Sequence, residues 1–198
     1  MQKNTSPQKY IYVVFSHPKS IVSETIGFFT GGEFTHCSLT LDRDLGHMFS
    51  FGRKYSYFPF IGCYLREELD KSFYSHCDSL RGRIVEIPVS DEQYANVKRR
   101  LIDFWVNKKH HKYNMVGFFF YLLNKDYAPD GKYTCSQFVA ETLDIHGICK
   151  INKAYTLVNP DDLSKIVKGN VIFDGDIKKY ALARKNKRFI MAKRKQEI

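Results

Sequence analysis

Short runs of β-branched and aromatic residues recur along the chain, separated by segments rich in glycine, proline, aspartate and serine. Runs that end at such turn residues are typical of β-strands. The strongest run is residues 10–15, Tyr-Ile-Tyr-Val-Val-Phe, which predicts a buried strand. Further strands are predicted at residues 34–41, 47–52, 83–89 and 171–173.

Residues 34–41 and 47–52 flank a turn-rich segment, Asp-Arg-Asp-Leu-Gly, and this arrangement predicts a β-hairpin. Side chains alternate between the two faces of a strand, so each run has one apolar and one more polar face. His36 lies on the polar face of the first run and Ser50 on that of the second. Burial of both apolar faces on one side of the sheet places Ser50 on the same side as His36.

Apolar residues at helical spacing predict most of the remaining elements. Ser90 is a suitable N-cap for a helix that starts at Asp91. Residues 115–123 are so uniformly apolar that they predict a buried helix. Other helices are predicted at residues 20–29, 135–146 and 160–168.

Residues 53–79 show no clear period and contain several tyrosines and phenylalanines. We predict a long aromatic loop here, with a short helix near residues 65–70. Loops of this length in a compact domain are often functional, so the segment is a candidate wall or lid for a substrate groove. The alternative is a cluster of aromatic side chains packed on the sheet.

The chain of 198 residues fits one domain, predicted to span residues 1–177 and to be followed by a basic C-terminal tail, residues 178–198. The tail contributes +8 of the formal net charge of +10, from nine Lys/Arg and one Glu. A tail of this kind is either a solvated extension or an electrostatic arm for an anionic surface. Specific binding of nucleic acid is not predicted, because no nucleic-acid motif accompanies the charge.

The five cysteines follow no paired disulfide spacing, and the first residues show no apolar segment of secretory type. We therefore expect reduced thiols and a cytoplasmic location. Adjacent pairs such as His36-Cys37 and the doublet His110-His111 lack the spacing of zinc ligands. Neither a metal nor another cofactor is expected.

Cys135 is the cysteine with the clearest chemical setting. Gly131 breaks the preceding structure and Thr134 is a plausible N-cap, which places Cys135 in the first turn of a helix. Helix-start N–H groups and the helix dipole favour an anion, so a thiol pKa of about 8.5 can fall to about 3.5–7.5 there. Cys135 is therefore a candidate thiolate nucleophile. The alternative is a small buried apolar residue, the usual role of a cysteine outside disulfides.

With these elements in place, the sequence resembles the circularly permuted branch of the NlpC/P60 superfamily, papain-like cysteine hydrolases related to the lecithin retinol acyltransferase group. Residues 34–39, Phe-Thr-His-Cys-Ser-Leu, resemble the histidine strand of the family, and residues 133–139, Tyr-Thr-Cys-Ser-Gln-Phe-Val, resemble its nucleophile helix. Tyr113-Asn114 resembles a Tyr-Asp element and residues 159–163 resemble a Pro-x-Asp-Leu element. The order of histidine before cysteine is the most specific signal, because unpermuted relatives have the reverse order.

The resemblance implies an α+β, papain-like fold in which a central antiparallel sheet packs against helices in a circularly permuted order. It implies Cys135 as the nucleophile and His36 as the base that takes its proton. A third polar residue orients the imidazole in the family and lies on the strand after the histidine strand. Ser50 occupies the equivalent place here, with His47, Ser38 or a water molecule as alternatives.

Three further residues are assigned to substrate binding on the same basis. Tyr113 corresponds to a tyrosine that lines the site in relatives, and Tyr133 and Thr134 directly precede the nucleophile.

The predicted function is hydrolysis of an amide bond, in a peptide of cell-wall type or in another small acyl amide, through a thiolate and a thioester. One alternative is a thiol acyltransferase or esterase that acts on lipid. Another is a non-catalytic binding module that uses the same groove. The expected partner is the peptide or acyl-amide substrate, with contact to an anionic surface through residues 178–198. The oligomeric state is left open.

Overall fold

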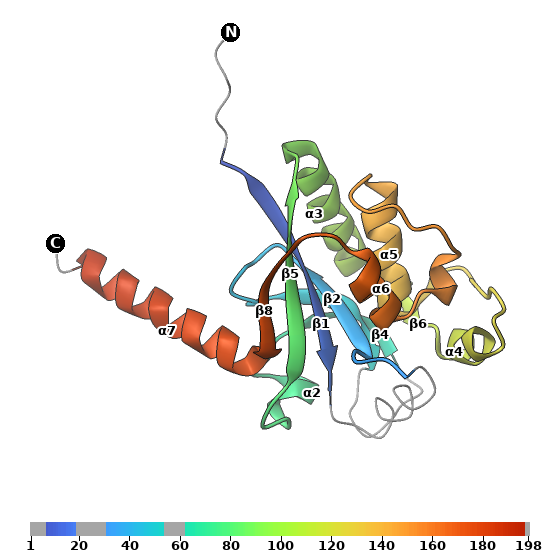
Figure 1. Ribbon diagram of the computed structural model, residues 1–198, viewed down its shortest axis with the longest axis horizontal. Coiled ribbons are helices and arrows are strands. Elements are labelled where there is room, and N and C mark those ends of the chain that lie inside the picture. Colours follow the sequence, from blue (N-terminus) through green and yellow to red (C-terminus); the bar gives the residue numbers. More distant parts are fainter. Residues whose placement is uncertain (1–6, 19–30, 54–61, 197–198) are drawn as a thin grey trace, which may run out of the picture.

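The computed structural model describes residues 7–18, 31–53 and 62–196 (Figure 1). Within these residues, eight strands form one open sheet in the order β7-β6-β4-β3-β2-β1-β5-β8. All neighbouring strands of the described sheet are antiparallel except β6 and β7, which are parallel. The strands are β1 (Lys9–His17), β2 (His36–Thr40), β3 (Met48–Arg53), β4 (Gly62–Glu67), β5 (Arg81–Val89), β6 (Lys112–Tyr113), β7 (Lys132–Tyr133) and β8 (Asn170–Asp176).

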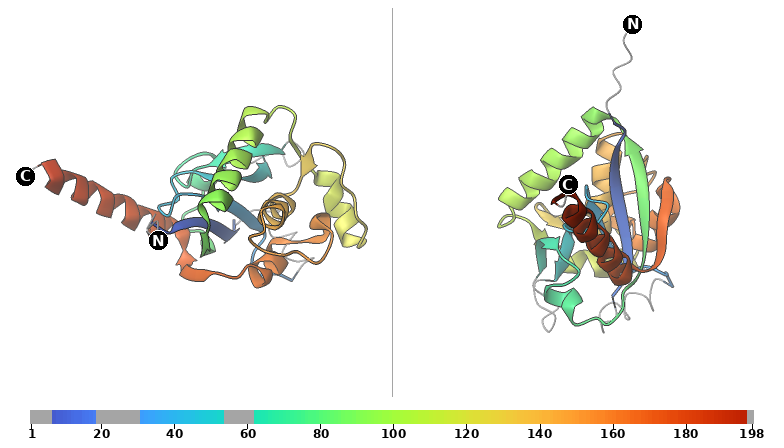
Figure 2. Two further views of the ribbon diagram at one scale, coloured as in Figure 1. Left: turned by 90° about the horizontal axis from the view of Figure 1, so that it is seen from above. Right: turned by 90° about the vertical axis from the view of Figure 1, so that its left-hand side faces the viewer.

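Helices cover the sheet and extend from its ends, so the fold is α+β (Figure 1, Figure 2). They are α2 (Ser72–Ser75), α3 (Asp91–Val106), α4 (Met115–Leu122), α5 (Cys135–Ile145), the 3₁₀ helix η1 (Tyr155–Leu157), α6 (Pro160–Ile166) and α7 (Ile177–Gln196). None of the helices in the described ranges is long and apolar enough to span a bilayer.

Two apolar cores lie on opposite faces of the sheet, because side chains alternate along each strand. The larger core joins one face of the sheet, including Phe51, to α3 and α5 through residues such as Leu101 and Phe138. The smaller core joins the other face to α2 and to the first turn of α7, where Ile177 is fully buried.

The predicted hairpin at residues 34–52 is confirmed. β2 and β3 are antiparallel, with Leu39 opposite Phe49. The turn between them is closed by the Asp42 carboxylate, which accepts the backbone N–H groups of Asp44 at 2.9 Å and Gly46 at 3.0 Å. The strands predicted at residues 10–15, 83–89 and 171–173 are confirmed as parts of β1, β5 and β8.

Four of the predicted helices begin at the predicted residue: α3 at Asp91, α4 at Met115, α5 at Cys135 and α6 at Pro160. Ser90 caps α3 through a reciprocal capping box with Gln93, and α5 begins at Cys135. The helix predicted at residues 20–29 lies outside the described residues.

The expectation that residues 115–123 are buried was wrong. α4 forms where predicted, but Val116, Phe119, Leu122 and Leu123 are exposed. Their spacing of three or four residues gives the helix one apolar face directed to solvent. The helix stands at one end of the molecule, apart from the main strands, and packs beside η1 (Figure 1).

The prediction for residues 53–79 was also wrong in part. Residues 62–67 form β4, paired with β3 along its length, and the short helix lies at Ser72–Ser75 and not near residues 65–70. Tyr64 of β4 is fully buried among aromatic side chains, which corresponds to the packed alternative for this residue. Residues 54–61 of the segment lie outside the described ranges.

Candidate active site

Thr134 sets the start of α5 at Cys135. The Thr134 hydroxyl oxygen accepts the N–H of Gln137 at 3.2 Å, and the Gln137 side-chain oxygen accepts the N–H of Thr134 at 3.4 Å. This capping box fixes the first turn. The first N–H groups of a helix have no carbonyl acceptor within it, so Cys135 stands where negative charge is favoured. The residue is buried, with 4% of its surface exposed.

The sulfur of Cys135 meets the sheet where β2 and β3 separate. Among the described residues of this hairpin, Leu39 and Phe49 are the one ladder pair. Nearer the start of β2, the N–H of Cys37 donates to the Cys135 sulfur, and the C=O of Cys37 accepts the Ser50 hydroxyl at 2.6 Å. The gap in the hairpin therefore provides both a place and a donor for the sulfur.

His36 reaches the same gap from the other face of the sheet. In the pairing of β1 with β2, His36 lies opposite Ser16 and Ser38 lies opposite Val14. Residues two apart on a strand point to the same face, so His36 shares the face of Val14, which belongs to the smaller core. Cys135 belongs to the larger core, on the α5 side. The His36 side chain is 14% exposed and forms a hydrogen bond with the Cys135 side chain. The structure thus brings together the two residues that the sequence predicted as nucleophile and base.

Glu67, the last residue of β4, holds the imidazole. One Glu67 carboxylate oxygen lies 2.9 Å from Nε2 of His36. The other oxygen accepts the Ser38 hydroxyl at 2.6 Å. Gly52 lies beside this pair, since a Cβ at that position would be in ordinary van der Waals contact with the carboxylate at 3.5 Å and with the imidazole ring at 4.0 Å. Glu67 is 7% exposed at its side chain, so water screens the pair little.

The surroundings shift the pKa values of both reacting groups. Burial disfavours a charged His36, but the Glu67 carboxylate and the Cys135 sulfur outweigh it and raise the pKa of His36 well above its ordinary value. Hydrogen bonds from the Cys37 thiol and from His36 hold the pKa of Cys135 well below the ordinary thiol value in spite of burial. Burial raises the pKa of Cys37, so this neighbour stays a thiol and a donor. At neutral pH these directions favour a thiolate beside an imidazolium.

Ser50 does not have the role predicted for it. It lies on the predicted strand and is fully buried, but its hydroxyl is donated to the Cys37 carbonyl. Glu67, one strand further along the sheet, takes the place beside His36. Of the alternatives, Ser38 contacts both His36 and Glu67, whereas His47 lies 4.0 Å from the carboxylate of Glu68.

The three predicted substrate-binding residues have structural roles in the described contacts. The Thr134 hydroxyl is used in the cap of α5. The ring of Tyr133 packs against Phe51 and Phe104, with centroids 5.1 and 5.3 Å apart. Tyr113 pairs with Tyr133 between β6 and β7 and packs against Gly62, where a Cβ would come within 2.5 Å of the Tyr113 Cβ. Tyr113 also lines a groove at the edge of the sheet.

Glu67 is the residue of the candidate site that sequence reasoning missed. Its signal was weak because the strand Gly-Cys-Tyr-Leu-Arg-Glu mixes large and charged residues without clear alternation.

Within residues 7–18, 31–53 and 62–196, no three His, Cys, Asp or Glu side chains are grouped so that they could hold a metal ion. No protein-family model, curated protein or solved structure matches this chain.

Proposed function

We propose that this chain is a papain-like cysteine hydrolase of the circularly permuted NlpC/P60 type, which cleaves an amide bond in a peptide or another small acyl amide. The observation that carries the proposal is the buried hydrogen-bonded series of Cys135, His36 and Glu67 at the start of α5. Nucleophile, base and orienting carboxylate in this order are the arrangement that acyl-transfer chemistry requires, whatever the chain order.

The position of these residues in the fold supports the permuted arrangement. The histidine strand β2 precedes the nucleophile helix α5 along the chain, and both pack at the centre of one sheet. The order matches that of the motifs on which the resemblance rests.

Acylation begins when the Cys135 thiolate adds to the substrate carbonyl carbon. The carbonyl electron pair moves to oxygen, and the N–H of Cys135 at the helix start is suited to stabilise this oxyanion. As the carbon–nitrogen bond breaks, the His36 imidazolium gives its proton to the leaving amine. The products of this half-reaction are the free amine, a thioester on Cys135 and a neutral His36.

Deacylation uses water. His36 takes a proton from a water molecule as the water oxygen adds to the thioester carbonyl. The carbon–sulfur bond then breaks, which releases a carboxylic acid and restores the thiolate and the imidazolium. Glu67 stabilises the imidazolium in both half-reactions and keeps the ring oriented toward the sulfur.

Alkylation of individual cysteines tests the proposal without a known substrate. At pH 6–7 we expect iodoacetamide to modify Cys135 about tenfold faster than Cys149, because a thiolate reacts and a thiol does not. Cys149 is a matched internal control, since burial raises its pKa and it is more exposed than Cys135. Peptide mass spectrometry over time gives both rates in one sample.

The variant His36→Ala completes the experiment. It removes the imidazolium, so Cys135 should lose its advantage while the rate at Cys149 stays the same. Equal rates at the two cysteines in the unaltered protein, or an unchanged rate at Cys135 in His36→Ala, would contradict the proposal and favour the non-catalytic binding module.

A lipid substrate is the second candidate, and one observation favours it. The exposed apolar face of α4, with Phe119 at 61% and Leu123 at 66% exposure, could accommodate an acyl chain or a bilayer surface. Incubation with an acyl ester and with a peptide amide, followed by intact-mass detection of the acyl-enzyme, distinguishes the two substrates. An acyl adduct on Cys135 from the ester alone would replace the amide proposal.

A further inference from the structure

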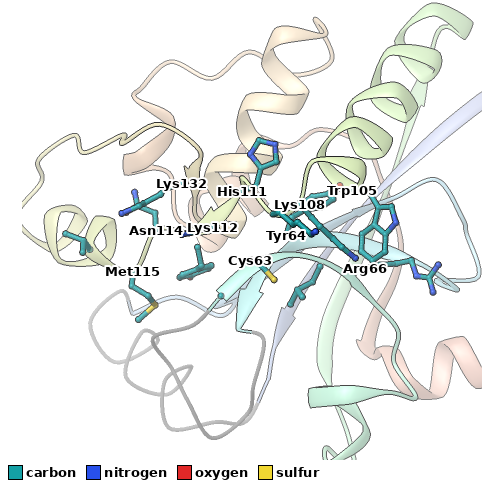
Figure 3. Close-up of a pocket in the computed structure, with 15 residues that line it drawn as sticks. Cys63, Tyr64, Arg66, Trp105, Lys108, His111, Lys112, Asn114, Met115 and Lys132 are labelled. Carbon is teal, nitrogen blue, oxygen red and sulfur yellow. The ribbon is translucent and has the colours of Figure 1, made fainter.

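A groove of about 750 Å³ lies at the sheet edge near α4, and no residue of the Cys135, His36 and Glu67 series lines it (Figure 3). Its walls are β4, the end of α3 and the segment from β6 into α4. Apart from the bridge between Cys63 and Lys112, no described strand pairs with this outer edge of β4. The volume is within the range of about 300–1,000 Å³ that is typical of small-molecule sites.

The lining of the groove is strongly cationic. Its charged residues are Arg66, Lys108, Lys109, Lys112 and Lys132, and no aspartate or glutamate of the described chain is among its lining residues. Arg66 is paired with Glu68 at 3.1 Å. The lysine ion pairs of the described residues are all made by other lysines, so four positive charges in the groove have no carboxylate partner there. His111 adds no charge, because burial lowers its pKa.

Two of these lysines are held side by side by the backbone. Lys112 of β6 and Lys132 of β7 are directly opposite in the parallel register of the two strands. Like charges on neighbouring strands repel each other and destabilise the pair. A bound anion between the two ammonium groups would offset this repulsion.

Trp105 adds a flat wall to the cationic lining. The Lys108 ammonium lies 3.8 Å from the centre of its ring and the Arg66 guanidinium 5.6 Å from it. Stacking on the ring holds both cations at the groove. Trp105 is also the one tryptophan of the chain, so its fluorescence reports on this site.

We propose that this groove binds a small ligand that carries two or more phosphate groups. A phosphate monoester has about 1.5–2 negative charges near neutral pH, so two of them balance the four lysines without a carboxylate partner. The ligand is a soluble polyphosphate or the headgroup of a phosphorylated lipid, and the exposed face of α4 next to the groove makes the second source relevant. The proposal is independent of the hydrolase function.

Titration of Trp105 fluorescence tests this site. The soluble probes are inorganic pyrophosphate, ATP and inositol hexakisphosphate, and the membrane probe is a phosphatidylcholine vesicle with or without phosphatidylinositol bisphosphate. The test variant is Lys112→Gln with Lys132→Gln, which leaves Lys108 in place over the reporter ring. We expect saturable binding and a loss of affinity of about tenfold for each lysine removed.

A second double variant, Lys187→Gln with Lys193→Gln, removes the same charge from α7 at the far end of the molecule (Figure 2). It should bind like the unaltered protein. Saturable binding of soluble probes that is weakened only by the groove variant supports a soluble ligand, and the same result with bisphosphate vesicles alone supports a headgroup. No saturable change with any probe, or equal weakening by both double variants, overturns the proposal.

Discussion

At the scale of single residues, the candidate site depends on how its polar groups divide their hydrogen bonds. Glu67 uses one carboxylate oxygen for His36 and the other for Ser38. The Ser50 hydroxyl donates to the Cys37 carbonyl, and the N–H of Cys37 donates to the Cys135 sulfur. Glu67 on β4 therefore stabilises the charge of the His36 imidazolium, whereas the β2–β3 hairpin sets the position of the Cys135 sulfur.

Glu67→Gln should raise the pH at which Cys135 becomes reactive. The Glu67 carboxylate stabilises the His36 imidazolium, and the imidazolium lowers the pKa of Cys135. Removal of the carboxylate charge lowers the pKa of His36 and so raises that of Cys135, by about 1 pH unit or more. The midpoint of the alkylation rate against pH measures the shift. Glu68→Gln, at the next residue, is the matched control and should leave the midpoint unchanged.

Ser50→Ala separates support of the backbone from orientation of the imidazole. The Cys37 carbonyl would lose a buried 2.6 Å hydrogen bond, so the free energy of unfolding should fall by about 1–3 kcal/mol. The imidazolium keeps Glu67, so the pH midpoint of Cys135 alkylation should shift less than in Glu67→Gln. Denaturant unfolding and the alkylation profile give the two values. A larger midpoint shift in Ser50→Ala than in Glu67→Gln would return Ser50 to the role first predicted.

Local signals in the sequence placed Cys135 at a helix start and His36 at a strand start, and the family resemblance suggested pairing them as nucleophile and base. A helix cap and a loop break identify the first, and a strand start on a polar face identifies the second. Glu67 gave no such signal, because its role depends on pairing of β4 with β3, a contact between segments that the sequence does not show to be adjacent. The assignment to Ser50 used the correct face of the hairpin but the wrong strand.

At the scale of elements, the basic tail is the main difference from expectation. Residues 178–198 were predicted as an extension, yet Ile177–Gln196 is one helix, α7. The composition of alanine, lysine and arginine favours a helix, and this propensity could have been used. The first turns contact the body of the protein: Lys178 donates to the Tyr74 carbonyl at 2.9 Å, and Arg184 pairs with Asp44 at 2.6 Å.

Changes at the two ends of α7 should differ greatly in their effect on stability. Ile177→Ala removes a fully buried side chain and should lower the free energy of unfolding by about 2–5 kcal/mol. Truncation after Arg188 removes residues such as Phe189 and Met191, which are 65% and 54% exposed, and should change it by less than about 0.5 kcal/mol. Urea unfolding of both proteins measures the difference. A large loss of stability on truncation would show that the end of α7 packs on the protein in solution.

At the scale of the whole molecule, the positive charge is divided between two distant places. α7 extends from one end of the sheet, whereas the lysine-lined groove and the apolar face of α4 lie at the other (Figure 1). The sequence analysis singled out only the tail as basic, although Lys108, Lys109 and Lys112 also lie close together along the chain, and Lys132 joins them only in the folded structure. Surface charge in this protein is thus a property of the folded arrangement as much as of composition.

The incomplete pairing of β2 and β3 connects the two apolar layers. If the two strands paired along their whole length, the hairpin would gain backbone hydrogen bonds. The backbone groups of Cys37 would then bond to β3, and the continuous sheet would separate the Cys135 thiol from the His36 imidazole. Reactivity at Cys135 therefore requires both layers to be docked at once. Partial unfolding of either layer would abolish it while the opposite core stayed intact.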